Sequence, residues 1–314
     1  MPSGKLEEQL ERIRLLRKAN PDSATVAILR KALSDRANLI VAEAARAAGE
    51  IHAAELIPDL LAAYSRLFED PVKTDPKCWG KTAIIKALTT MDYSESPPYV
   101  RGSTHVQMEP VWGKVEDAAG PLRSNCILAL PQCSDLQRFD IFRRLVDALM
   151  DPLDPVRIEA VRAIEQMNGD EAPLLLRLKA LAGDLRPAVT GCAFDAILQL
   201  ESEKGLAFVA GFLKSVDAEV RDEAALAMGA WRHPSAVQIL IAEWNDTIDR
   251  EFRSVLLRAM SSSREESALE FLLGLVREGP RQYAESALEA LEIHTGSADI
   301  QERIALARNA RLPD

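Results

Sequence analysis

The sequence predicts an all-α protein, a right-handed α-α superhelix of about eight two-helix repeats with one irregular insertion. Three observations predict this fold class. An eleven-residue pattern recurs along the chain, with an apolar residue, Arg, and then Ala or another small residue at two positions one helical turn apart. Apolar residues make up 47% of the 314 residues but aromatic residues only 5%, which suits close packing of helices more than a sheet. Pro and Gly separate stretches that have the apolar periodicity of helices.

The spacing of the pattern indicates stacked units. Its clearest copy begins at Val156-Arg157 and places Ala160 and Ala163 one helical turn apart. The Arg position recurs at intervals of 34, 33, 31, 32 and 31 residues from Arg123 onward. Weaker copies of the pattern carry another residue at this position: Thr190, Ala284, Lys81 and Val41. A period of this length is typical of solenoids, in which each two-helix unit contacts its neighbours.

The apolar periodicity predicts the helices in order. The first spans 5–19, because Leu6, Leu10 and Ile13 fall on one face of a helix. Two helix pairs follow, at 23–34 with 36–50 and at 53–69 with 77–91. Five more are expected from residue 135: 135–150 with 154–168, 171–183 with 186–201, 203–215 with 217–231, 234–246 with 248–261, and 265–278 with 280–293. A last helix spans 298–311.

Two early intervals are longer than the others and mark irregular segments. Val41 and Lys81 lie 40 residues apart, and Lys81 and Arg123 lie 42 apart. The first interval contains a long joint at 69–76, and the second contains the segment 93–114. Pro97-Pro98 is unfavourable to a helix, and polar and apolar residues alternate over 105–109 with a period of two. We therefore expect a single solenoid domain over 1–314, with N-terminal repeats at 1–92, a non-helical insertion at 93–114, and regular repeats with a C-terminal cap at 115–314.

The insertion supplies the candidate binding residues, because insertions in solenoids often lie on the binding face. These residues are Tyr99, Arg101, His105, Gln107, Glu109 and Trp112. In an extended segment His105, Gln107 and Glu109 share a face, where His and a carboxylate can serve acid–base chemistry or contribute to a metal site. The same group can instead be a hydrogen-bonded cluster that fastens the insertion to its neighbours. Two possible ligands do not make a metal site, so we expect neither a metal nor a cofactor.

The repeat itself resembles a known family. Residues 217–229, which read DAEVRDEAALAMG, look like the second helix of a HEAT or bacterial HEAT-like repeat of the phycobilisome-lyase type, and residues 154–157 (DPVR) are similar. The resemblance covers nearly the whole chain and is strongest over 135–293. In that family repeated Asp and Arg residues bridge adjacent units. This implies a structural ladder made of Arg123, Arg157, Asp217, Arg221, Asp249 and Arg253, interrupted at Thr190 and Ala284.

Charge and composition bear on the partner and on the cellular compartment. The net charge is −10, whereas a nucleic-acid binder usually has a basic stripe, so nucleic acid is not the expected partner. The four Cys residues form no C-x-x-C pair, which is typical of reduced thiols in a cytoplasmic protein. No stretch approaches the roughly 18 apolar residues of a membrane span.

The sequence therefore predicts a non-enzymatic interaction scaffold or a regulatory or assembly factor. We expect a monomer that binds a protein or peptide on the concave face of the solenoid and on the insertion. The alternative is an enzyme on a HEAT-like frame, which would resemble bilin lyases or alkylpurine DNA glycosylases in fold alone. A glycosylase needs a basic groove for the phosphate backbone, which the acidic balance of charges disfavours.

Overall fold

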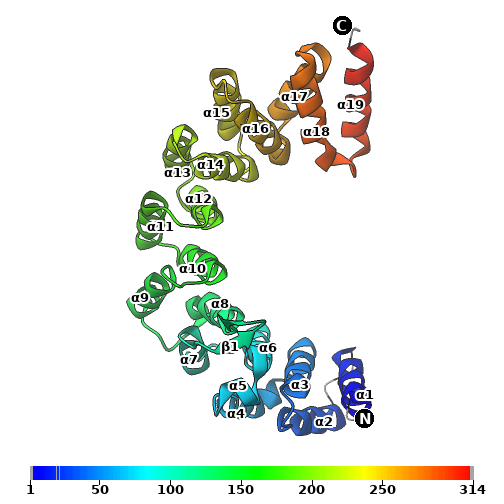
Figure 1. Ribbon diagram of the computed structural model, residues 1–314, viewed down its shortest axis with the longest axis vertical. Helices are drawn as coiled ribbons and strands as arrows, with labels where there is room; N and C mark the ends of the chain where they lie inside the picture. Colours follow the sequence, from blue (N-terminus) through cyan, green and yellow to red (C-terminus); the bar gives the residue numbers. More distant parts are fainter. Residues whose placement is uncertain (1–2, 19, 21, 312–314) are drawn as a thin grey trace. The chain divides into compact units, whose positions relative to one another are not determined.

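The computed structural model describes residues 3–18, 20 and 22–311, and almost all of its regular structure is helical (Figure 1). The predicted end of the first helix at residue 19 and the last three residues of the predicted domain lie outside the described residues. Contacts divide the chain into two compact units, Met1–Gln166 and Met167–Asp314. None of the described helices is long and apolar enough to span a membrane.

The first unit contains helix pairs and one short β-hairpin. Its elements are α1 (Ser3–Leu15), η1 (Leu16–Lys18), α2 (Ser23–Leu33), α3 (Asn38–Glu50), η2 (Ala54–Leu56), α4 (Ile57–Arg66), α5 (Pro71–Thr74), η3 (Pro76–Cys78), α6 (Trp79–Thr90), α7 (Pro97–Ser103), β1 (Met108–Val111), β2 (Lys114–Asp117), α8 (Gly120–Ala129), η4 (Leu130–Gln132), α9 (Arg138–Ala148) and α10 (Asp154–Met167), which ends at the boundary between the units.

Small residues allow the second helices of the first unit to stack closely. Helices α3, α6 and α8 pack in a row, and α2, α4 and α7 each pack on their own partner in that row. A Cβ added to Gly49 on α3 would lie 3.0 Å from the Cα of Ala87 on α6. Backbones this close leave no room for larger side chains where the two helices touch, which explains the small residues of the repeat.

The second unit consists of helix pairs and a terminal helix. Its elements are α11 (Glu171–Ala182), α12 (Pro187–Glu201), α13 (Glu203–Ala210), η5 (Gly211–Lys214), α14 (Ala218–Ala230), α15 (Pro234–Asp246), α16 (Arg250–Ser263), α17 (Glu266–Glu278), α18 (Arg281–Leu291), η6 (Glu292–His294) and α19 (Ala298–Ala310).

The second unit has the same packing. Helices α12, α14, α16 and α18 form a row in which each contacts the next, and α19 packs on α17 at the end. The two repeat positions on α14, Ala224 and Ala227, are buried. A Cβ added to Gly229 would lie 2.2 Å from the carbonyl oxygen of Ala259, so α14 and α16 meet backbone to backbone at this point.

These contacts confirm the prediction of an all-α, HEAT-like solenoid of about eight two-helix repeats. The packed pairs are α2–α3, α4–α6 and α7–α8 in the first unit, and α11–α12, α13–α14, α15–α16 and α17–α18 in the second. Helices α9 and α10 follow one another in the chain as the eighth pair. Most helix ends lie within a few residues of their predicted positions, as for α12 and α16. The helical periodicity of apolar residues is therefore sufficient to locate the regular repeats.

The prediction of a non-helical segment over 93–114 is wrong in part. Pro97 begins helix α7, which is the first helix of its pair and packs on α8. Pro97 and Pro98 occupy the first turn, where backbone N–H groups have no partner within the helix and Pro is tolerated. The extended part of the insertion is a β-hairpin whose second strand runs on to Asp117, three residues beyond the predicted boundary.

Candidate functional site

The long joint before α6 turns sharply and directs Asp75 toward the start of that helix. Lys77 and Cys78 have φ angles of 61° and 54°, in the left-handed region. Asp75 Oδ1 accepts a hydrogen bond from the Gly80 N–H at 2.7 Å, and its Oδ2 accepts one from the Lys81 N–H at 3.0 Å. The carboxylate therefore satisfies two N–H groups of the first helical turn, which have no partner within α6.

Lys81 stands where the stronger copies of the repeat have Arg, and its side chain is fully buried. Its Nζ lies 3.1 Å from Asp75 Oδ2. It also donates to the carbonyl oxygen of Leu67 at 3.1 Å and to Gln107 Oε1 at 3.0 Å. A buried ammonium group requires this full set of partners, and the insertion supplies one of them.

Gln107 connects the insertion to the joint. Its Oε1 lies 3.0 Å from Cys78 Sγ and 3.1 Å from His105 Nε2. Its Nε2 donates to the carbonyl oxygen of Asp75 at 2.9 Å and to Glu109 Oε1 at 2.6 Å. Burial raises the pKa of Cys78 to about 12, so the thiol is protonated and acts as a donor. The structure thus brings together His105, Gln107 and Glu109 against the joint, with Gln107 and Glu109 buried and His105 half-buried.

The chemistry open to this polar cluster is limited by its own hydrogen bonds. The Gln107 amide stands between His105 and Glu109, so the His ring contacts an amide group rather than a carboxylate. Glu109 Oε1 also accepts from the Lys77 N–H at 2.7 Å. Burial lowers the pKa of His105, whose ring packs edge-on against Phe68. In the described part of the chain, no group of three or more His, Cys, Asp or Glu residues could hold a metal ion. These contacts favour the interpretation that the cluster fastens the insertion to the joint.

The other three candidate residues of the insertion lie apart from this cluster. Tyr99 is buried, and its hydroxyl donates to the carbonyl oxygen of Tyr93 at 2.7 Å. The guanidinium group of Arg101 lies over the ring of Phe68, at 3.9 Å from the centroid. Trp112 is fully exposed at the tip of the hairpin. Of the six candidates, only Arg101 and Trp112 are exposed to solvent.

In the first unit Arg123 and Arg157 occupy the repeated Arg position. Arg123 binds the hairpin and the joint before α10, and Arg157 binds that joint. Arg123 is buried and forms ion pairs with Asp117 at 2.6 Å and Asp151 at 2.7 Å. Burial by itself would raise the pKa of Asp117, but hydrogen bonds from two backbone N–H groups and from Arg123 outweigh it and lower this pKa. Arg157 donates to the carbonyl oxygens of Asp151 and Pro152, at 2.7 and 3.2 Å.

In the second unit one Arg–Asp pair connects neighbouring repeats. Arg221 Nη2 on α14 lies 2.7 Å from Oδ2 of Asp249. Asp217 and Asp249 are the N-caps of α14 and α16, and each accepts two backbone N–H groups. Arg253 donates instead to the carbonyl oxygen of Trp244 and to the Tyr283 hydroxyl.

The β-hairpin ends in a two-residue turn at Trp112-Gly113. Val111 pairs with Lys114, and the two residues between them have φ angles of 44° and 83°. Two-residue hairpin turns with positive φ at both positions favour Asn-Gly or Gly-Gly, because a bulky residue is strained there. The hairpin nevertheless carries a Trp at the first turn position, and its ring is entirely exposed.

The two faces of the hairpin have the reverse of the usual polarity. Gln107 and Glu109 point inward and are 2% and 8% exposed, whereas Val106 and Met108 point outward and are 57% and 51% exposed. Val115 on the second strand is 62% exposed. A hairpin on a protein surface normally buries its apolar side chains and exposes its polar ones. We call the exposed residues Val106, Met108, Trp112 and Val115 the outer hairpin face.

A groove of about 500 Å³ runs beside the outer hairpin face. Val106 and Met108 line the groove together with Met150, which follows the end of α9 and is 78% exposed. Arg144 also lines the groove, and its buried Nε has no hydrogen-bond partner among the described residues. The groove therefore combines an apolar lining with an unused hydrogen-bond donor.

The sequence pattern contains the residues of the outer hairpin face, but only Trp112 among them is a predicted binding residue. The period of two over 105–109 predicts two faces and does not say which is buried. The signal for the outward face is Trp112, because a large aromatic residue at a strained turn position has no packing reason to be there. Met150 and Arg144 could not be found in this way, since they reach the groove from α9 and the joint after it.

The comparison with protein families agrees with the repeat pattern. Residues 206–292 match the family model of HEAT repeats. No curated protein matches the sequence. Among solved structures, human deoxyhypusine hydroxylase in complex with glycerol is similar at 20% identity, over 85% of this chain and 100% of that chain, with a TM-score of 0.31. Two engineered proteins are also similar, at 18% identity over 96% of this chain and 88% of the other (TM-score 0.39), and at 17% over 88% and 96% (TM-score 0.29). Likeness at this level carries no conclusion about activity or ligand. The fold and the repeat define a HEAT-like helical-repeat protein.

Proposed function

We propose that this helical-repeat protein is a non-enzymatic interaction scaffold, acting as a regulatory or assembly factor, and that it binds a segment of a partner protein on the outer hairpin face. The observation that carries the proposal is the reversed polarity of the hairpin. Its polar side chains are used to hold it on the solenoid, and its apolar side chains are left in solvent. Exposed apolar residues gathered in this way mark interaction surfaces.

The groove supports a protein segment as the ligand. A volume of about 500 Å³ falls within the range of ligand pockets, roughly 300–1,000 Å³. An apolar side chain of the partner fits between Met108 and Met150, and a carbonyl or carboxylate oxygen next to it can accept a hydrogen bond from Arg144. Extended segments offer this combination of apolar side chains and backbone acceptors along their length.

Trp112 is the anchor in this proposal. Trp is enriched among the residues that dominate binding energy, because it buries a large area and loses little conformational freedom. Exposed aliphatic residues also occur elsewhere, as at Leu185, Val216 and Ile248, each at the joint before a helix of the second unit. Those three belong to separate joints, and α11 exposes Leu174, Leu178 and Leu181. The outer hairpin face differs in gathering four apolar residues beside a groove that two of them line. The concave face of the helix stack remains part of the proposal as a further contact surface for the same partner.

The test is a comparative capture experiment followed by a titration. The bait is the full chain, either native or with Val106→Ser, Met108→Ser and Trp112→Asn. Asn is chosen at the turn because it tolerates a positive φ. Proteins captured from an extract of the native cells are identified, and a protein lost with the variant is purified and titrated by calorimetry. We expect at least a tenfold weaker Kd for the triple variant, because three apolar contacts are removed.

The control removes the same number of exposed apolar side chains from the second unit, with Leu185→Ser, Val216→Ser and Ile248→Ser. This control should bind the purified partner as the native protein does. Equal sets of captured proteins from native chain and hairpin variant would contradict the proposal, and so would equal losses in the hairpin variant and the control.

A further inference from the structure

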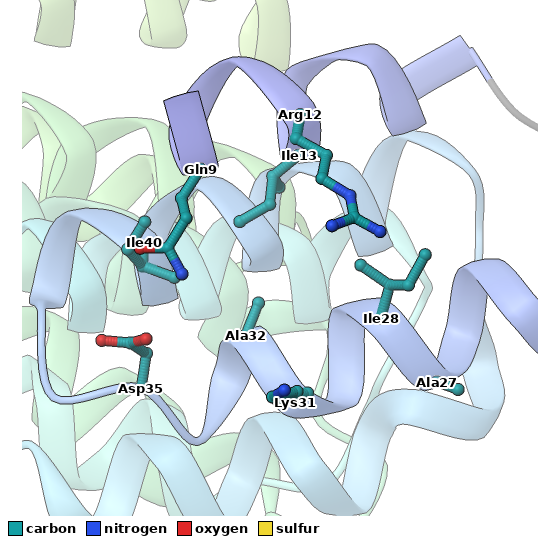
Figure 2. A pocket seen from close by; sticks show the side chains of 9 residues that line it. All are labelled: Gln9, Arg12, Ile13, Ala27, Ile28, Lys31, Ala32, Asp35 and Ile40. Carbon is teal, nitrogen blue, oxygen red and sulfur yellow. The ribbon is translucent and has the colours of Figure 1, made fainter. Parts of the chain in front are cut away.

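A second pocket lies at the N-terminal end of the first unit, between α1 and α2, with a volume of about 350 Å³ (Figure 2). It exists because α1 is fixed to α3 and leaves the neighbouring surface of α2 uncovered. Ile13 of α1 is buried, and Glu43 of α3 binds Arg17 at 2.6 Å and Arg46 at 3.0 Å. The carboxylate of Glu43 therefore holds the N-terminal segment at one edge of the unit.

The floor of the pocket is aliphatic. Ile13, Ala32 and Ile40 are buried at its base, and Ile28 is half-buried beside them. Figure 2 shows Ile13 coming from α1 and Ile28 from α2, with their side chains directed toward the space between the helices. No aromatic residue lines the pocket, so it offers no platform on which a nucleic-acid base could stack.

Two cations reach the pocket from its opposite walls. Arg12 lies on α1 and Lys31 on α2, and neither side chain forms an ion pair or hydrogen bond with a described residue. Their neighbour Arg30, by contrast, is paired with Asp59 at 3.0 Å. The one carboxylate of the lining, Asp35, accepts a hydrogen bond from the Ala37 N–H at 2.9 Å. The pocket thus has two cations for one carboxylate, in a stretch, residues 1–50, where nine basic residues outnumber seven acidic ones although the whole chain carries −10.

We propose that this pocket binds an acidic amphipathic segment of a partner protein. An aliphatic side chain of the segment rests on Ile13 and Ile28, and carboxylates on either side of it meet Arg12 and Lys31. Charge complementarity argues for this occupant, because an apolar segment without carboxylates leaves both cations unused and a basic one repels them. The pocket shares no residue with the groove at the outer hairpin face, so it constitutes a second binding site.

The test uses two fluorescein-labelled peptides of about 12 residues, both with Leu at helical spacing. One carries Glu at the intervening positions and the other carries Lys. Fluorescence anisotropy with the full chain should show saturable binding of the Glu peptide, weakening as salt is added, and at least tenfold weaker binding of the Lys peptide. Arg12→Ala with Lys31→Ala should weaken binding of the Glu peptide about tenfold.

The matched control removes two exposed cations elsewhere, with Lys86→Ala and Lys204→Ala, and should leave the affinity unchanged. Arg12 and Lys31 are exposed and make no contact that folding requires, so the double variant should melt as the native protein does. The proposal is overturned by absent saturable binding of the Glu peptide, by equal binding of the two peptides, or by unchanged affinity in the Arg12/Lys31 variant. The hairpin triple variant should bind the Glu peptide normally, and a loss there would place the peptide at the hairpin instead.

Discussion

Lys81 Nζ lies 3.1 Å from Asp75 Oδ2, and neither side chain is exposed to solvent. The two residues belong to α6 and to the irregular joint before it. Because Gln107 of the insertion also bonds Lys81, this ion pair lies where the two irregular segments of the chain meet. The stability of the outer hairpin face therefore depends on a buried charge pair beneath it.

Asp75→Ala should destabilise the protein strongly, by about 3–5 kcal/mol, because it leaves the Lys81 ammonium group buried without a counter-charge. Lys81→Met should cost less, about 1–3 kcal/mol, since the Asp75 carboxylate keeps its hydrogen bonds from the Gly80 and Lys81 N–H groups. Urea unfolding followed by circular dichroism measures both changes. Equal stability of Asp75→Ala and native protein would show that the pair is not buried as described.

Gln107→Leu should loosen the hairpin without unfolding the stacked helices. The substitution removes the amide that bonds His105, Glu109 and Lys81, at a cost of about 1–3 kcal/mol for the polar groups left unpaired. Hydrogen–deuterium exchange should become faster over residues 105–118, while α2 and α3 keep their native protection. Unchanged exchange in the hairpin would mean that the polar cluster does not hold it.

Acidification should weaken the attachment of His105. Burial holds the pKa of His105 below its ordinary value of 6.5. Between the folded pKa and 6.5 the unfolded chain binds more protons at this residue than the folded protein does. The free energy of unfolding therefore rises with pH across this window and falls as the pH drops below 6.5.

Two measurements check the pH dependence. The His105 ring resonance, assigned with a His105→Gln variant, should titrate with a midpoint below 6.5. The variant should also lose less stability than the native protein between pH 7.5 and 5.5. His294 has a pKa shift of the same direction and cause, so the comparison with the variant isolates the part that belongs to His105. A midpoint at or above 6.5 would contradict the partial burial of the ring.

Asp217 and Asp249 should differ in their contributions, although both are N-caps. Asp217→Ala removes a cap, at a cost of about 1 kcal/mol. Asp249→Ala should cost more, because it also removes the partner of Arg221. Asp249→Asn keeps the cap and should cost at most about 1 kcal/mol, since the pair is partly exposed to solvent. Thermal melting of the three variants gives the order, and a larger loss in Asp217→Ala than in Asp249→Ala would contradict it.

Gly229→Ala should lower the melting temperature even though Ala favours helix more than Gly. The new Cβ would lie 2.2 Å from the carbonyl oxygen of Ala259, so α14 and α16 would have to move apart. The cost of overpacking, about 1–3 kcal/mol, exceeds the gain of about 1 kcal/mol in helix propensity. Gly274, on α17, has open space around the same position, so Gly274→Ala is the matched control and should not destabilise. A stabilised Gly229→Ala variant would contradict the close packing of the two helices.

The regular repeats could be predicted from the sequence because their signals are local. Apolar periodicity and the pair of small residues, such as Ala224 and Ala227, recur in successive two-helix repeats. Each repeat packs on its neighbour in the same way. The error at Pro97-Pro98 is also local. Pro is unfavourable inside a helix but tolerated in its first turn, and the sequence did not show that a helix begins there.

The candidate site could be predicted only in part, because its contacts join segments that both depart from the repeat. The alternation at 105–109 predicts that His105, Gln107 and Glu109 share a face. Nothing in it shows that the joint at 69–76 provides their partners, since that contact spans about thirty residues and follows no period. That contact decides which side faces solvent, so the alternation alone does not show that Gln107 and Glu109 are buried while Val106 and Met108 are exposed.

The central claim, that the outer hairpin face binds a protein, is tested most directly by site-specific photo-crosslinking in the native cells. Benzoylphenylalanine replaces Val115 in one chain and Val216, which is exposed on the second unit, in another. The proposal predicts one dominant crosslinked protein from position 115 that is absent from position 216. Crosslinking of the same proteins from both positions, or no crosslinked protein from position 115, would contradict it.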